Sequence, residues 1–170
     1  LAKSSIYLKQ SKVKKAKISL IMGIKILPEN FRAIFQLGNV YLMEKNYEKA
    51  VKEFDKAIKI KTDFWQAINN KGLAYYELNK VDLSITSFKK AIDLEENAEP
   101  LLALATCLKN KDINKAIFFA KKALNKEPNY VDFNYRKEQL WGEKLQISTE
   151  KLFENPQLKN EILFAKSKIE

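Results

Sequence analysis

The chain has 170 residues, and its 31 lysines and arginines against 21 aspartates and glutamates give a net charge of +10 at pH 7. A hydrophobic content of 46% with only 4 glycines and 4 prolines excludes a disordered chain and predicts long ordered elements joined by short turns. The absence of histidine excludes a catalytic histidine, a histidine-ligated metal and a cysteine–histidine pair. Because lysine, alanine, leucine, isoleucine and glutamate far outnumber valine and threonine, we predict an all-α fold.

The remaining residues offer little for catalysis. Cys107 lies among alanines and leucines and is expected to be a small buried residue rather than a nucleophile. The acids Asp82, Glu95 and Glu96 lie in polar runs, with no serine elbow or glycine-rich phosphate loop nearby. We therefore expect no enzyme activity, no metal site and no cofactor.

The apolar stretches and the first residues of the chain are considered for membrane insertion and cellular location. The stretches "SLIMGIKIL" and "LLALATCL" fall well short of the ~18 residues that span a bilayer, so no membrane span is expected. No secretory signal is visible, which favours the cytoplasm for this segment. The chain opens on Leu1 rather than on methionine, so we expect that a further segment, with any targeting information it holds, precedes it.

The first 30 residues are strongly basic, with seven lysines against Glu29. Five of these lysines cluster around the expected first turn and form a candidate basic patch: Lys9, Lys12, Lys14, Lys15 and Lys17. Such a patch could attract nucleic acid, an anionic membrane surface or an acidic protein, and the alternative is a solvated helix face. Base-specific recognition is disfavoured because Arg32 and Arg136 are the only arginines, and arginine is the usual reader of guanine.

Residues 31–98 contain one irregular pattern twice, 34 residues apart. Gly38, Tyr41, Phe54, Ala57 and Ile58 recur as Gly72, Tyr75, Phe88, Ala91 and Ile92. A fixed period of this length is typical of a solenoid of supersecondary units. In each unit, apolar residues at helical spacing form two runs around a polar turn, so each unit is predicted to be a helical hairpin.

Small residues and a capping residue fit this hairpin. Gly38 on the first helix and Ala50 on the second would allow the two axes to approach closely, and Ala57 would allow contact with the next unit. Asn46, at the end of the turn, is expected to cap the second helix.

These residues resemble the tetratricopeptide repeat (TPR) family, whose pattern runs from an aliphatic or aromatic residue through Leu-Gly, Tyr, Ala, Phe and Ala to Pro. Residues 31–64 match it through Ile34, Leu37, Gly38, Tyr41, Ala50, Phe54 and Ala57, with Thr62 in place of the proline. Residues 65–98 match it with departures at Lys71, Ser84 and Glu96. Residues 1–30 are expected to be a partial repeat that keeps Tyr7, Ala16, Leu20 and Pro28. Residues 99–130 are expected to be a degenerate repeat that keeps Ala116, Ala120, Ala123 and Pro128.

Beyond residue 130 the period fades, and residues 131–170 are predicted to be capping helices, which the end of a solenoid needs. Val131, Tyr135 and Trp141 are expected to face inward from one helix that stops at Gly142. Asn155 and Pro156 are expected to begin the last helix. The "LWG" and "NP" motifs in this segment also resemble the C-terminal ends of cyanobacterial TPR proteins.

The resemblance implies a right-handed superhelical solenoid whose first helices line a concave face. The amides on that face could bond a peptide backbone, and its large apolar groups could anchor side chains. The candidate peptide-binding residues are Arg32, Phe35, Gln36, Asn39, Leu42, Gln66, Asn69, Asn70, Leu73 and Tyr76. The alternatives are that Phe35 and Leu42 only pack between helices and that the asparagines are only solvated.

Two known partner classes are disfavoured. TPR domains that hold the acidic tails of heat-shock chaperones need lysines and an arginine at fixed concave positions, where this chain has Phe35, Asn39, Asn70, Pro100 and Leu104. The register one unit earlier supplies no cation either. The related pentatricopeptide RNA binders have basic grooves, whereas the concave set here has only Arg32 as a cation.

The sequence thus predicts a scaffold without catalysis that binds a peptide or protein segment on its concave face. The alternative is a basic adaptor that docks on nucleic acid, a membrane surface or an acidic protein through its lysine-rich N-terminal edge.

Overall fold

The computed structural model describes the backbone of residues 2–169 and the side chains of residues 12–169. In this range every regular element is a helix, which confirms the all-α prediction. The α-helices are α1 (Ala2–Ile26), α2 (Phe31–Met43), α3 (Tyr47–Ile60), α4 (Trp65–Glu77), α5 (Val81–Leu94), α6 (Ala98–Leu108), α7 (Ile113–Lys126), α8 (Phe133–Glu138), α9 (Glu143–Phe153) and α10 (Lys159–Ile169). Two 3-10 helices, η1 (Pro128–Val131) and η2 (Pro156–Leu158), precede α8 and α10 respectively.

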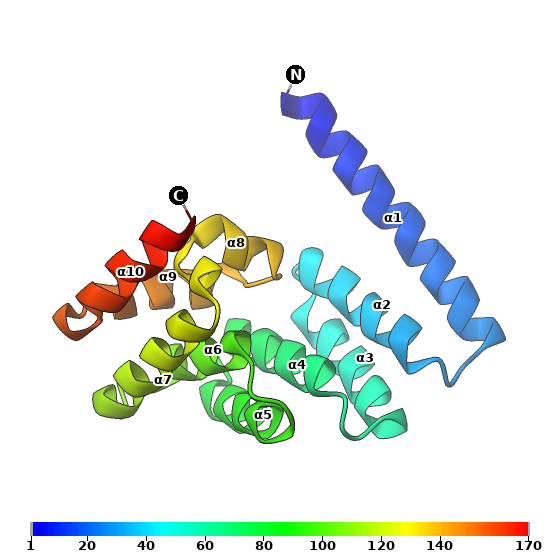
Figure 1. Ribbon diagram of the computed structural model, residues 1–170. Helices are drawn as coiled ribbons and strands as arrows, with labels where there is room; N and C mark the ends of the chain where they lie inside the picture. Colours follow the sequence, from blue (N-terminus) through cyan, green and yellow to red (C-terminus); the bar gives the residue numbers. More distant parts are fainter. Residues whose placement is uncertain (1, 170) are drawn as a thin grey trace.

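Helices α2 to α7 form three stacked hairpins (Figure 1). Helix α2 packs on α3, α4 on α5 and α6 on α7, and each hairpin packs on the next through α3 and α4 or through α5 and α6. The helical solenoid predicted from the repeats is therefore confirmed. We call the side lined by the first helices, α2, α4 and α6, the concave face.

The turns of the first two hairpins have the same geometry. Lys45 and Asn79, which are equivalent in the repeat, both adopt the left-handed conformation, with φ of 56° and 60°. The backbone N–H of the next residue then bonds back to a tyrosine carbonyl, from Asn46 to Tyr41 at 2.8 Å and from Lys80 to Tyr75 at 2.9 Å. Asn46 also caps α3, as predicted, since its Oδ1 accepts from the backbone N–H of Lys49.

Glycine allows the two helices of each hairpin to approach closely. A Cβ atom on Gly38 would lie 2.5 Å from Cε1 of Phe54, and one on Gly72 would lie 2.6 Å from Cε1 of Phe88. Both rings are fully buried, so neither has free space to move into. The glycine of each repeat therefore makes room for the phenylalanine of the same repeat.

The N-terminal helix α1 is continuous, and no turn separates the lysines of the basic patch. Ser11 and Lys12 occupy the positions that Lys45 and Asn46 hold in the first hairpin. This pair lacks the asparagine that each of the next two turns uses, either as a cap or in the left-handed conformation. Helix α1 instead packs beside α2 and extends past it (Figure 1).

The C-terminal segment differs from the prediction in one respect. The single helix expected to stop at Gly142 is divided, because α8 ends at Glu138 and the chain turns through Leu140, which has φ of 67°. Gly142 is instead the N-cap residue of α9. Val131 and Trp141 are buried as predicted. Asn155 and Pro156 begin η2, which leads directly into α10.

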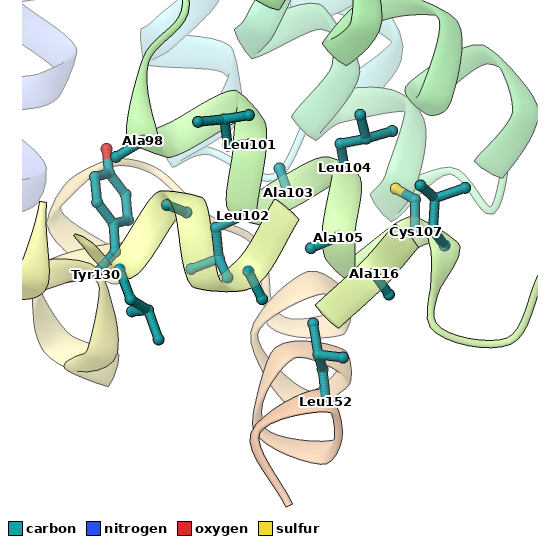
Figure 2. Packing of buried hydrophobic residues seen from close by; sticks show 14 of the residues in the cluster. Ala98, Leu101, Leu102, Ala103, Leu104, Ala105, Cys107, Ala116, Tyr130 and Leu152 are labelled. Atoms are coloured by element: carbon teal, nitrogen blue, oxygen red, sulfur yellow. The ribbon is translucent and has the colours of Figure 1, made fainter. Parts of the chain in front are cut away.

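Helix α6 is enclosed along its length: every residue from Ala98 to Leu108 is buried except Glu99, which is half-buried as a residue but has an enclosed carboxyl group. Figure 2 shows Leu101 and Leu104 on one side of α6 and Leu152 of α9 on the opposite side. A helix that is apolar all round needs cover on all sides. Helices α5, α7 and α9 supply this cover.

Candidate functional site

The C-terminal segment covers part of the concave face. Helix α9 packs against α4 and α6, two of the three helices that line this face. Leu145 and Leu152 of α9 are fully buried there. A ligand can therefore contact α2 directly, but it can contact much of α4 and α6 only if α9 moves away.

Glu77 fixes the start of α9. Its side chain is buried, and its two carboxylate oxygens accept from the backbone N–H groups of Lys144 at 3.3 Å and Leu145 at 3.0 Å. These N–H groups belong to the first turn of α9, where an anion is favoured by the helix dipole. A Cβ atom on Gly142 would collide with the Glu77 side chain, so a larger residue would disturb this contact.

Three further side-chain bonds join the C-terminal segment to the concave face. Tyr76 donates to Ser148 Oγ at 2.7 Å. The hydroxyls of Thr106 and Thr149 lie 2.8 Å apart in the interior. These bonds, with those of Glu77, satisfy polar groups that an open groove would leave to solvent or ligand.

The third of these bonds runs from Trp141 Nε1 to Glu99 Oε1, at 3.0 Å. Burial raises the pKa of Glu99 from 4.5 to about 7, while hydrogen bonds from Trp141 and Asn69 oppose this shift. The folded chain therefore holds a proton on Glu99 more tightly than the unfolded chain does.

We expect the free energy of unfolding to fall as the pH rises from about 4.5 to about 7, because the folded state retains the Glu99 proton across this range and the unfolded state loses it. Glu99→Gln keeps an acceptor for Trp141 but cannot ionise, so it should flatten this part of the pH profile. Urea unfolding of both chains across this pH range measures the difference. An equal slope in the two chains would show that other groups cause it.

The predicted peptide-binding residues on α4 are mostly enclosed. Asn69, Asn70 and Leu73 are buried, while Gln66 and Tyr76 are half-buried. The asparagines bond to each other and to α2, since Asn69 donates to Asn70 Oδ1 at 3.1 Å. Asn70 in turn donates to Asn39 Oδ1 at 2.8 Å. These amides already hold α2 against α4.

On α2 the predicted residues divide into two groups. Arg32 and Gln36 are exposed and open to a ligand. Phe35 is half-buried beside Phe64, with a ring-centroid distance of 4.9 Å, so it has a packing role. Leu42 is buried against the core of the first hairpin. Peptide contact by the whole predicted set stays a prediction.

A cavity of about 600 Å³ lies between the ends of α2 and α3 and the C-terminal segment. We call it the α2–α8 cavity; its lining residues are Leu42, Met43, Lys45, Tyr47, Phe133, Lys137, Glu138, Leu140, Trp141, Gly142, Glu143 and Gln146. Met43 and Phe133 are large apolar residues with 46% and 43% of their surface exposed, which leaves them accessible to a ligand. Of the twelve lining residues, only Leu42 belongs to the set predicted from the sequence.

Arg136 holds the wall formed by the C-terminal segment. Its guanidinium is fully buried and donates to the carbonyls of Tyr130 at 2.7 Å and Val131 at 3.0 Å. It also donates to Gln146 Oε1 at 2.9 Å and pairs with Glu150. Burial lowers the pKa of Arg136, and the nearby Glu150 opposes that effect. One side chain thus ties η1, α8 and α9 together.

The basic patch is only partly free. Lys12, Lys14 and Lys15 are exposed on α1, and the side chain of Lys9 lies outside the described residues. Lys17 has its Nζ 2.5 Å from a carboxylate oxygen of Glu44 and 4.6 Å from the ring centroid of Tyr41. Lys17 therefore helps to pack α1 on α2.

Other features bear on chemistry. Cys107 is buried, as predicted, and burial raises the pKa of its thiol to about 12, so it is not a thiolate at neutral pH. Among the side chains that the structure describes, those of residues 12–169, no three acidic or cysteine side chains are grouped in a way that could hold a metal ion. Over the same range, no helix combines the length and the apolar character that crossing a membrane requires.

Comparisons with known proteins agree with the repeat architecture. Residues 38–79 match the family described as "TPR repeat", and residues 66–97 match "Tetratricopeptide repeat". No curated protein matches the chain.

Several solved structures share the fold at low sequence identity. MamA is 17% identical with a TM-score of 0.69, and the match covers 94% of this chain and 92% of MamA. YrrB, described as a TPR protein with an unusual peptide-binding site, is 18% identical with a TM-score of 0.62 and coverage of 96% and 88%. TTC0263 of Thermus thermophilus is 22% identical with a TM-score of 0.63 and coverage of 77% and 73%. The family matches therefore show tetratricopeptide repeats over residues 38–97, and the structural likenesses show that the chain shares its fold of stacked helical hairpins with MamA, YrrB and TTC0263.

Proposed function

We propose that this scaffold binds a short segment of a partner protein, with an apolar side chain of that segment seated in the α2–α8 cavity. The observation that carries the proposal is the cavity itself, which lies between the end of α2 and the segment from α8 to the start of α9. Its volume of about 600 Å³ lies within the range of ligand sites in proteins.

The lining of the cavity suggests the kind of segment. Met43 and Phe133 offer exposed apolar contact surface, which suits a large aliphatic or aromatic side chain as the anchor. Two lysines and two glutamates surround them, Lys45, Lys137, Glu138 and Glu143, and these can meet backbone groups or charges on either side of the anchor. YrrB is described as having a peptide-binding site, which makes peptides a sensible first probe for this chain too.

The open residues of the predicted set extend this site. Arg32 and Gln36 are exposed on α2, so a segment that continued from the cavity along α2 would reach them. Binding on α4 at Tyr76 would require α9 to leave, because Tyr76 bonds to Ser148 of α9. We therefore propose that the segment lies along α2 and the cavity.

A peptide library displayed on phage would supply ligands, and the affinity of a selected peptide would then be measured by calorimetry. Met43→Lys and Phe133→Lys are each expected to weaken binding by about tenfold or more, because they place a charge in the apolar anchor site. Both residues are exposed, so the thermal unfolding midpoint should change little.

Phe118→Lys is the matched control. Phe118 is 60% exposed on α7 and is not among the residues that line the cavity. Peptides that bind the native chain and Phe118→Lys equally, but not the cavity variants, would support the proposal. Peptides that bind all four chains equally would place the site elsewhere and overturn it.

A further inference from the structure

Helix α1 exposes large apolar side chains at positions where the equivalent helices are polar. Ile18, Ile21 and Met22 of α1 are 59%, 37% and 60% exposed. The repeat period places exposed Lys52, Asp55 and Lys56 of α3, and exposed Thr86, Lys89 and Lys90 of α5, at the same three positions. The hairpin stack therefore does not need apolar residues there.

These side chains form one continuous surface that faces away from the domain. Ile26, which is 77% exposed, extends it to the end of α1. We call Ile18, Ile21, Met22 and Ile26 the outer stripe. Lys17 and Ile24 lie on the side of α1 that packs on the first hairpin, since Lys17 pairs with Glu44 and Ile24 contacts the core of that hairpin.

The outer stripe lies on a helix with charge of one sign. Helix α1 has seven lysines and no acidic residue, so it carries +7 of the net +10 of the chain. Lys14, Lys15 and Lys25 are exposed. Their aliphatic stems can lie along an apolar environment while their ammonium groups reach anionic groups at its edge.

We propose that α1 lies flat on an anionic lipid surface, with the outer stripe among the acyl chains and its lysines against the lipid phosphates. A helix of 25 residues is about 37 Å long, so its whole length can lie in the plane of the interface. Apolar insertion and the attraction of several lysines supply the two contributions that stable interfacial binding needs.

Other occupants fit these observations less well. Nucleic acid would engage the lysines but leave the outer stripe in water. Pairing of α1 with α1 of a second copy would bring together two helices that each carry seven lysines and no acid, and the like charges would repel. An anionic membrane surface offers phosphate groups to the lysines and acyl chains to the outer stripe.

The test is flotation of the full chain with vesicles of phosphatidylcholine alone and of equal parts phosphatidylcholine and phosphatidylglycerol. We expect binding to the anionic vesicles only, decreasing as salt is raised. The decisive variant is Ile18→Lys with Met22→Lys, which gives α1 the residues that α3 has at these positions. It adds two positive charges, so a purely electrostatic site would bind more tightly. We instead expect about a tenfold or greater loss of vesicle affinity, because two apolar anchors are removed.

Thr86→Lys with Asn114→Lys is the charge-matched control, since both residues are exposed on other helices and the change also adds two positive charges. This control should bind like the native chain. A second readout is Met22→Trp, whose added emission should shift to the blue with anionic vesicles. Unchanged or stronger binding by the Ile18→Lys, Met22→Lys variant, or no blue shift, would overturn the proposal. So would binding to single-stranded nucleic acid without any binding to vesicles.

Discussion

Arg136→Met is expected to lower the free energy of unfolding by about 3 kcal/mol or more, because it leaves several buried acceptors without a donor. Methionine fills much of the volume of arginine, so a cavity contributes little to this loss. The carbonyls of Tyr130 and Val131 and the amide oxygen of Gln146 would all lose their bonds to the guanidinium. Urea unfolding gives the total loss. Hydrogen exchange should locate it in η1, α8 and α9.

Glu150→Gln is the control that separates the ion pair from the carbonyl contacts. Half of the Glu150 side chain is exposed, so water compensates much of the lost charge, and we expect a cost below about 1 kcal/mol. Arg136→Lys should lie between the two variants, because one ammonium cannot reach all the acceptors that the guanidinium reaches. If Glu150→Gln cost as much as Arg136→Met, the ion pair rather than the carbonyls would hold the segment.

Loss of the Arg136 bonds would also affect the α2–α8 cavity. Gln146 lines the α2–α8 cavity and bonds to Arg136, while Trp141 and Leu140 lie on the same wall. Leu140 is in the left-handed conformation, which a side chain branched at Cγ adopts only when its packing holds it there. It packs against the core of the first hairpin. Loosening the turn around Leu140 would therefore deform the cavity.

The repeats could be predicted from the sequence because the residues that form the close helix–helix contact occur twice at the same spacing. Gly38 with Phe54 and Gly72 with Phe88 are the same close contact in successive units, so periodicity alone reveals it. The third hairpin was also expected from its alanines, and these are buried where α7 packs on α6. Local spacing carries this information, and no contact distant in the sequence is needed to find it.

The position of α9 could not be predicted in the same way. Glu77 bonds to Leu145, which is 68 residues away, and no period connects the two. A polar residue on the concave face looks the same in the sequence in two cases: when it binds a ligand, and when it bonds to a later part of its own chain. One signal was available: the run "LLALATCL" is apolar all round a helix, which indicates that α6 must be covered on its concave side too.

The basic patch shows a similar limit. Lys17 and Lys15 look alike in the sequence, yet Lys17 meets Glu44, which lies 27 residues away. The outer stripe was visible as part of an apolar stretch, but its exposure depends on which side of α1 packs on α2. Sequence gives the character of each helix face, and only the structure tells which face is covered.

Gly72→Ala is expected to destabilise the chain by about 1–3 kcal/mol, although alanine is the better helix former. The added methyl group would lie 2.6 Å from Cε1 of Phe88, whose ring is fully buried, so α4 and α5 must move apart. Gly23→Ala makes the same change on α1, where no atom lies within 4 Å of the added group. It should therefore stabilise the chain by about 0.5–1 kcal/mol. Chemical denaturation of both variants tests this opposite sign.

The consequence of Gly72→Ala should reach beyond its own hairpin. Gly72 lies on α4 about one turn before Tyr76 and Glu77, which hold Ser148 and the first turn of α9. A shift of α4 would lengthen those bonds, so hydrogen exchange in α9 should become faster. Adding Phe88→Leu gives the methyl group room and should restore slow exchange in α9, even though the smaller side chain itself weakens the core. If α9 stayed slow in Gly72→Ala, the close packing of the repeat and the cover of the concave face would be independent of each other.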